Sequence, residues 1–177
     1  MNLIYKTRNI FMSIFLFVLM IFFMFSCTDT KKNQDFPFYK QSNSNSCGPA
    51  CLRMIFKYYG EDYTEEYLNK ITHADSVRGT SFLDLNDAAN LHGLIAKGVK
   101  INFDELNTMV PLPCIVHWNP NHFVVVYKIE NSKIYVADPG DSLKVYTKEE
   151  FCDSWFEPEY ADEKAGVALV FEKRSAN

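Results

Sequence analysis

One cysteine of this sequence stands where a helix is expected to begin. Cys47 follows a run of Ser and Asn and is followed by Gly48 and Pro49. Proline is tolerated in the first turn of a helix, because the first N–H groups have no acceptor within the helix. The thiol then lies at the positive end of the helix dipole, which stabilises a thiolate. This position predicts a nucleophile, with a buried packing residue as the alternative, and we expect Gly48 to let a substrate backbone approach the sulfur.

A nucleophilic cysteine needs a general base, and the sequence offers four histidines. His73 and His92 lie in or beside the predicted helical half, where a solvated histidine is the ordinary case. His117 and His122 flank a turn, and His122 opens a strand that is otherwise apolar. We therefore predict His122 as the base, against a satisfied core histidine.

Asp138 is the carboxylate that can orient this histidine. If residues 130–132 form a three-residue loop, Val124 faces Asp138, and Asp138 becomes the diagonal neighbour of His122, roughly 7 Å away at Cα. A two-residue turn would move Asp138 to the other face of the sheet. Asp-Pro-Gly is also strong turn chemistry by itself, so the carboxylate has a purely structural explanation as well.

The periodicity of apolar residues predicts helices in the first half of the chain and strands in the second. Helices are expected over residues 49–59, 64–71, 80 or 81 to 91, and 148–156. Strands are expected over residues 96–101, 113–118, 122–129, 133–138, 143–146 and 166–171. Helices followed by sequential strands predict an α+β fold with an antiparallel sheet.

The N-terminus predicts a targeting segment. Lys6 and Arg8 precede an apolar run, residues 10–25, that ends just before Cys27. About 16 residues are short for a spanning helix, and the small residue before Cys27 suits lipoprotein processing. We predict a lipoprotein signal peptide over residues 1–27 with a lipidated Cys27; an uncleaved membrane anchor stays open. Either way the rest of the chain is expected on the exported side of a bacterial membrane.

Composition predicts one domain after a polar tether. The chain has 177 residues, 47% of them apolar and 23% charged, which is enough for one core. Residues 28–35 read as the tether and residues 36–173 as the domain. A net charge of -4 without a basic stripe argues against a nucleic-acid partner.

Three motifs in order resemble a known family. They are QSNSNSCGPACL, LPCIVHWNPNHFVVV and YVADPG, and they are similar to the bacteriocin-processing cysteine peptidases that cleave double-glycine leaders. Those are papain-like domains usually found at the N-terminus of peptide-exporting ABC transporters. The resemblance covers about residues 36–172. It implies an N-terminal helical lobe that carries the cysteine and a C-terminal antiparallel sheet that carries the histidine and the aspartate.

The resemblance also implies a role for each site residue. Cys47 is the nucleophile, His122 the general base and acid, and Asp138 the residue that orients His122. Gln41 matches the position whose side-chain amide joins the Cys47 backbone N–H in the oxyanion hole. The implied reaction is hydrolysis of a leader peptide through a thioester, without a cofactor.

The chain departs from the family in several places. It has no Gly-rich ATP-binding loop and no set of further hydrophobic spans, so a partner exporter would be a separate protein. Many relatives carry Asp where this chain has Ser46. The expected export also differs, because the family domain works on the cytosolic face.

Other functions stay open. A transglutaminase-like acyl transferase also orders Cys, His and Asp along an α+β chain, and a non-catalytic peptide-binding module would keep the fold without turnover. Cys51, Cys114 and Cys152 are expected to be buried packing residues. A zinc site built from Cys47, Cys51, Cys114 and His117 has only a weak spacing pattern.

Overall fold

The computed structural model describes residues 36–75, 77–118 and 120–174. The predicted signal or anchor segment, the predicted lipidation at Cys27 and the predicted tether lie outside these residues. Within the described ranges, no helix combines the length and the apolar character needed to span a membrane.

Three helices form the first part of the domain, and each boundary has a local cause. In α2 the buried Leu52, Ile55 and Phe56 recur at helical spacing, and Gly60 ends the helix with a left-handed φ of 97°. The hydroxyl of Thr64 accepts a hydrogen bond from the Tyr67 N–H and caps α3. The bounds are α2 (Cys47–Tyr59), α3 (Glu65–Ile71) and α4 (Phe82–Leu91).

Six strands form one antiparallel sheet, in the order β1-β6-β2-β3-β4-β5. The predicted α+β fold is confirmed, and every predicted strand is present with ends shifted by one or two residues. The strands are β1 (Leu94–Asn102), β2 (Cys114–Trp118), β3 (His122–Glu130), β4 (Lys133–Ala137), β5 (Leu143–Thr147) and β6 (Ala165–Lys173).

Three further helical segments lie among the strands: α5 (Phe103–Thr108), α6 (Lys148–Trp155) and the 3-10 helix η1 (Pro158–Glu163). Helix α5 was not predicted, although the sequence contains a capping signal at its start. The side chains of Asn102 and Glu105 form a reciprocal capping box at its start, the pattern that opens many helices.

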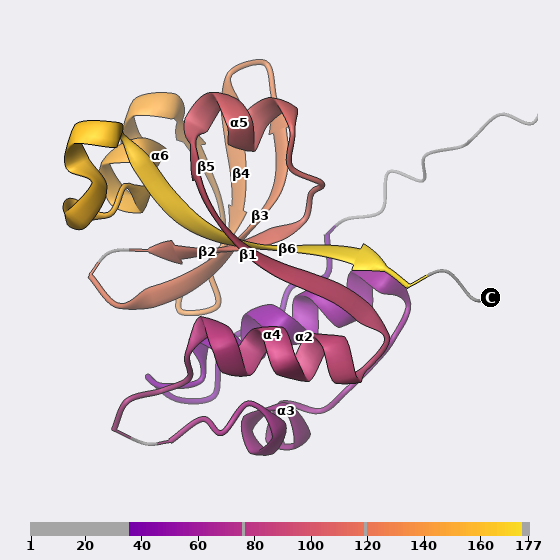
Figure 1. Cartoon of the computed structure of the whole chain (residues 1–177). Helices are drawn as coiled ribbons and strands as arrows, with labels where there is room; N and C mark the ends of the chain where they lie inside the picture. The colour runs from indigo at the N-terminus through magenta and orange to yellow at the C-terminus, as the bar shows by residue number, and fades with distance from the viewer. Residues whose placement is uncertain (1–35, 76, 119, 175–177) are drawn as a thin grey trace, which may run out of the picture. The chain divides into compact units, whose positions relative to one another are not determined.

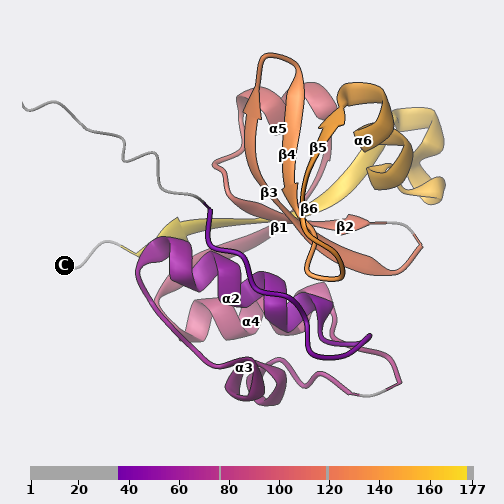
Figure 2. The same ribbon diagram turned by 180° about the vertical axis from the view of Figure 1, so that it is seen from behind.

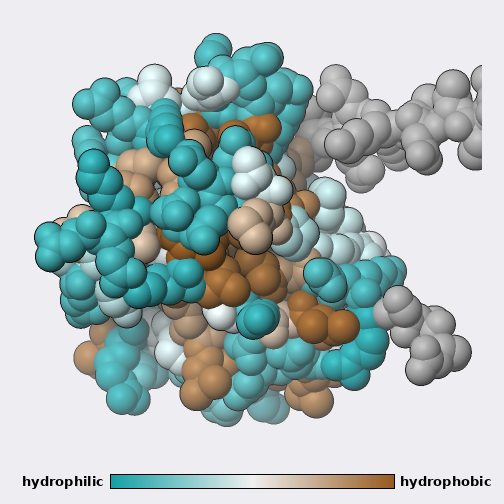
Figure 3. Space-filling model, turned by 45° about the horizontal axis from the view of Figure 1, so that its top comes forward, coloured by the Kyte–Doolittle hydropathy of each residue, from teal (hydrophilic) through white to brown (hydrophobic). Residues whose placement is uncertain are grey.

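The helices lie in two groups on the two sides of the twisted sheet. In Figures 1 and 2, α2, α3 and α4 lie on one side, and α5 and α6 on the other. One buried cluster includes Phe56 of α2 and Val125 of β3, and a second includes Trp155 of α6 and Val124 of β3. Alternate residues of β3 thus enter opposite cores, which fixes the register of this strand. On the face shown in Figure 3, hydrophobic residues gather across the middle and hydrophilic ones surround them.

The hairpin between β3 and β4 corrects the predicted loop. Glu130 pairs with Lys133, so the turn has two residues, Asn131 and Ser132, both with positive φ. A β-bulge between Val126 and Lys128 then shifts the register by one residue, and Val125 pairs with Ala137. The bulge compensates for the shorter turn, so that Asp138 still falls on the predicted face.

Candidate active site

The thiol of Cys47 belongs to the first residue of α2, one step further into the helix than predicted. The residue is 8% exposed. The backbone N–H groups of Phe123 and Gly48 donate to its sulfur. The sulfur therefore lies where the helix meets the start of β3, and the unpaired N–H groups of the first turn face it.

The reactivity of this thiol is set by opposing effects. Burial raises the pKa of Cys47, but a hydrogen bond from His122, the Phe123 N–H and the positive charge of His122 together bring the pKa below its ordinary value. A thiolate at this position is accordingly stabilised by its neighbours, as nucleophilic cysteines require.

His122 and Asp138 form a close pair beside the sulfur. His122 Nε2 lies 2.8 Å from Asp138 Oδ1, which leaves Nδ1 for Cys47. Burial by itself lowers the pKa of His122, yet the hydrogen bonds to Asp138 and Cys47 raise it to about 9. Burial raises the pKa of Asp138, and the bonds from His122 and the Gly140 N–H outweigh this and lower it. The arrangement favours a thiolate beside an imidazolium.

Gln41 reaches this site because its segment runs back along α2. Phe36 lies near Tyr58 at the end of the helix, with ring centroids 6.1 Å apart, and Tyr39 stacks on Arg53 at 3.9 Å, further toward the helix start. Figure 2 shows the segment lying along the outside of α2. Gln41 follows, at the level of the Cys47 turn.

The Asp-Pro-Gly turn holds Gln41 in place. The Gln41 backbone N–H donates to the Pro139 carbonyl at 2.9 Å, and the Gln41 Nε2 donates to the Asn43 carbonyl at 2.7 Å. A Cβ built on Gly140 would lie 3.5 Å from Gln41 Oε1 and 3.6 Å from His122 Cε1, so these side chains converge on Gly140. Each amide nitrogen carries two protons, and Asn43 takes one of them. The second proton is not used by this bond.

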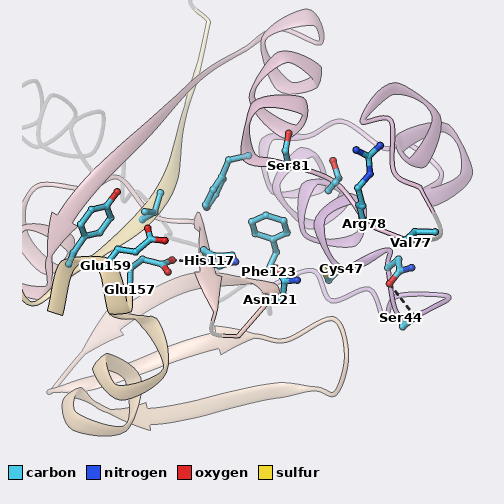
Figure 4. Close-up of a pocket in the computed structure, with 16 residues that line it drawn as sticks. Ser44, Cys47, Val77, Arg78, Ser81, His117, Asn121, Phe123, Glu157 and Glu159 are labelled. Atoms are coloured by element: carbon cyan, nitrogen blue, oxygen red, sulfur yellow. Dashed lines mark hydrogen bonds and ion pairs between the residues drawn. The ribbon is translucent and has the colours of Figure 1, made fainter.

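A pocket of about 460 Å³ opens beside Cys47. Figure 4 shows it running from the loop with Val77 and Arg78, past Cys47, toward His117. The rings of Phe82 and Phe123 meet edge to face in its wall, with centroids 4.9 Å apart. Cys47 lines the pocket together with these two rings.

Gly48 has a packing role that we did not predict. A Cβ on Gly48 would lie 2.2 Å from Thr80 Cγ2 and 3.2 Å from Phe123 Cδ2. Thr80 packs on the helix start and lines the pocket, so the absence of a side chain allows the two segments to close around Cys47.

A second histidine pair in the pocket was missed. His117 Nδ1 lies 2.6 Å from Glu157 Oε1, and their side chains are 25% and 12% exposed. The sequence suggested His117 only as an alternative base or as a ligand in a weak zinc pattern. Glu157 follows α6 in an irregular segment 40 residues away, and no spacing pattern in the sequence connects the two.

The other described cysteines differ from Cys47. Cys51 is completely buried, and its thiol donates to the Phe123 carbonyl at 3.2 Å. Burial raises the pKa of Cys51 well above its ordinary value, that of Cys114 to about 12 and that of Cys152 to about 11. In the part of the chain that the structure describes, no three His, Cys, Asp or Glu side chains are placed to hold a metal ion.

Known proteins are similar to this chain in sequence and in fold. Residues 35–161 match the model of the Peptidase C39 family. Pediocin PA-1 transport/processing ATP-binding protein PedD from Pediococcus acidilactici is 37% identical over 124 residues, which are 65% of this chain and 17% of PedD. The match thus covers less than a fifth of that protein.

Two solved structures agree with the fold. A double glycine motif protease from an AMS/PCAT transporter, crystallised with its leader peptide, aligns with a TM-score of 0.70 and 31% identity over 77% of this chain and 91% of that chain. The peptidase domain of Streptococcus ComA, a bi-functional ABC transporter, aligns with a TM-score of 0.68 and 24% identity over 78% and 99% of the two chains. The predicted papain-like peptidase fold is therefore confirmed.

These relatives correct the predicted location. We expected the domain on the exported side of a membrane, whereas PedD is named a transport/processing ATP-binding protein. ATP is a cytoplasmic substrate, so this relative contradicts the exported location, and that prediction is wrong.

The cysteine at a helix start, the histidine at the start of a strand and the match over residues 35–161 point to the same conclusion. The chain belongs to the peptidase C39 family of cysteine peptidases.

Proposed function

We propose that this chain cleaves a peptide bond after a double-glycine type leader, with Cys47, His122 and Asp138 as the catalytic residues. The observation that carries the proposal is the continuous contact from sulfur to imidazole to carboxylate, with the 2.8 Å bond between His122 and Asp138. This chain of contacts is the arrangement of a base held in position by a third group.

The roles follow from the chemistry of each atom. The Cys47 thiolate attacks the scissile carbonyl, and the Cys47 N–H with the free amide proton of Gln41 stabilises the oxyanion. His122 gives its proton to the leaving amine, and a thioester with Cys47 forms. His122 then takes a proton from water, which attacks the thioester and releases the acid. Asp138 keeps the imidazole oriented throughout.

The substrate class is carried by likeness to the relatives. The double glycine motif protease was crystallised with a leader peptide, and PedD is named for processing and transport. We propose a leader peptide of an exported peptide as the substrate and a separate peptide exporter as the partner.

We propose that the apolar run within residues 1–27 holds the chain at a membrane. Membrane fractionation of the full chain tests this. A chain recovered in the membrane pellet supports the proposal, and a chain in the supernatant overturns it.

Peptide cleavage tests the catalytic proposal. The full chain is incubated under reducing conditions with leader peptides that end in Gly-Gly or Gly-Ala, beside a Cys47→Ala variant and a Cys114→Ala control. We expect cleavage after the second small residue in the wild type and the control, and none in Cys47→Ala. Binding without cleavage, unchanged in Cys47→Ala, would instead favour a peptide-binding module. Transfer to an added amine faster than to water would favour an acyl transferase.

A further inference from the structure

The pocket continues beyond Cys47 and ends at the pair of His117 and Glu157. His117 lies on β2, and Glu157 lies between α6 and η1. Figure 4 places them on the side of Phe123 opposite Cys47. Glu159 and Tyr160 line the same end. The proposed mechanism uses none of these side chains.

This end of the pocket has an excess of negative charge. His117 occupies Glu157 Oε1, and no described residue donates to Oε2. Lys100, which stacks over the Tyr160 ring, is already paired: its Nζ lies 2.8 Å from Glu163. The opposite end carries Arg78, which pairs with Asp75 at 3.0 Å. Glu157 thus lines the pocket with one carboxylate oxygen to which none of the residues that the structure describes donates.

The position of His122 decides which part of a substrate lies here. The leaving amine must lie against His122 to receive its proton. His122 and Asp138 do not line the pocket, whereas Cys47 does. The pocket therefore takes the acyl part of the substrate, which lies upstream of the scissile bond.

We propose that Glu157 is a specificity-determining residue that binds a basic side chain, lysine or arginine, a few residues upstream of the scissile bond. The inference rests on the proposed peptidase function. The rings of Phe82 and Phe123 cover the methylene groups of such a side chain, while its charged end reaches Glu157 Oε2. His117 holds the carboxylate toward the pocket.

Competitive peptide cleavage tests this with the full chain. Each peptide carries Gly-Gly before the scissile bond and one lysine, norleucine or glutamate at the third to sixth position upstream, and mass spectrometry gives the kcat/KM ratios. At one position we expect lysine to exceed norleucine by about tenfold, since a partly exposed ion pair contributes modestly, and glutamate to be the poorest. The Glu157→Gln variant should bring lysine and norleucine within about twofold.

Glu163→Gln is the matched control, because Glu163 lies on η1 but pairs with Lys100 outside the pocket. It should keep the wild-type preference. His117→Gln, a second variant, should weaken the preference without abolishing cleavage of the norleucine peptide. A wild-type chain that cleaves both peptides equally, or a preference that survives in Glu157→Gln, overturns the inference and leaves the peptidase intact. Absence of all cleavage overturns the proposed function itself.

Discussion

Two histidine–carboxylate pairs line up along one side of the domain, and their surroundings differ. His122 lies 2.8 Å from Asp138 and His117 lies 2.6 Å from Glu157, and both histidine side chains are 25% exposed. Only His122 contacts the sulfur of Cys47, and its pKa rises to about 9. A carboxylate partner by itself therefore does not distinguish the two histidines; the adjacent thiol, whose proton His122 can take, does.

The two pairs also differ in how the chain assembles them. His122 and Asp138 lie at the start of β3 and just after β4, which are joined by one hairpin, and the register of that hairpin brings them together. His117 and Glu157 come from β2 and from an irregular segment after α6. The first pair is fixed by local pairing, and the second by packing of distant segments.

The largest expected effect separates the two histidines. His122→Ala should lower kcat for a neutral Gly-Gly peptide by at least about 10⁴-fold, because the thiolate loses its proton partner. His117→Ala should change the same kcat by less than about tenfold, because its ring does not touch the sulfur. Steady-state kinetics of both variants checks this, and equal losses would contradict the assignment of His122.

The next effect separates the two carboxylates. Asp138→Asn should lower kcat by about 10² to 10⁴-fold, since His122 loses the group that fixes its tautomer and raises its pKa. Glu157→Gln should leave turnover of a neutral peptide nearly unchanged. A single-turnover acylation rate for each variant distinguishes the roles. Equal rates for Asp138→Asn and the wild type would remove Asp138 from the mechanism.

Gln41→Ala tests the proposed oxyanion hole beside the catalytic pair. Removal of one oxyanion donor costs about 10² to 10³-fold in kcat. The expected loss falls in kcat rather than in KM, because the bond forms in the transition state. Asn43→Ala is the matched control, because Asn43 accepts from Gln41 through its backbone carbonyl, which the variant keeps. Full activity of Gln41→Ala would place the oxyanion hole elsewhere.

The smallest effect concerns the scaffold of the second pair. A Cβ on Gly166 would lie 2.5 Å from the Trp155 ring and 2.7 Å from its carbonyl oxygen. Gly166→Ala should lower the free energy of unfolding by about 1 to 3 kcal/mol and displace the segment that carries Glu157. Gly98→Ala, on the paired strand β1 with open space around it, should be nearly neutral. Urea denaturation measures both, and equal midpoints would contradict this packing.

Local signals predicted much of this fold and of the catalytic pair. Gly60 and Thr64 mark helix boundaries through backbone geometry and capping, which depend on neighbours in the sequence. The predicted hairpin loop was wrong, yet Asp138 lies where predicted, because the bulge between Val126 and Lys128 absorbs the error. A bulge depends on how both strands pack, and the sequence carries no pattern for it.

Features that depend on contacts between distant segments could not be predicted from the sequence. The contact of Gly48 with Thr80 joins two segments 32 positions apart in the chain, so Gly48 was given a role in substrate access. The pair of His117 and Glu157 lacks any shared motif for the same reason. The location of the domain required relatives, since an apolar N-terminus by itself does not show where the rest of the chain works.

The rate of Cys47 alkylation against pH tests the central claim most directly, because it follows the thiolate itself. Below pH about 9 His122 carries its proton, and its charge and hydrogen bond keep the pKa of Cys47 below the ordinary value. In wild type the rate with iodoacetamide should therefore reach its plateau below the ordinary thiol pKa. In His122→Ala burial still raises the pKa of Cys47, only the Phe123 and Gly48 N–H groups still lower it, and the midpoint should move upward. Identical midpoints in the two proteins would contradict the account, because His122 would then not create the nucleophile.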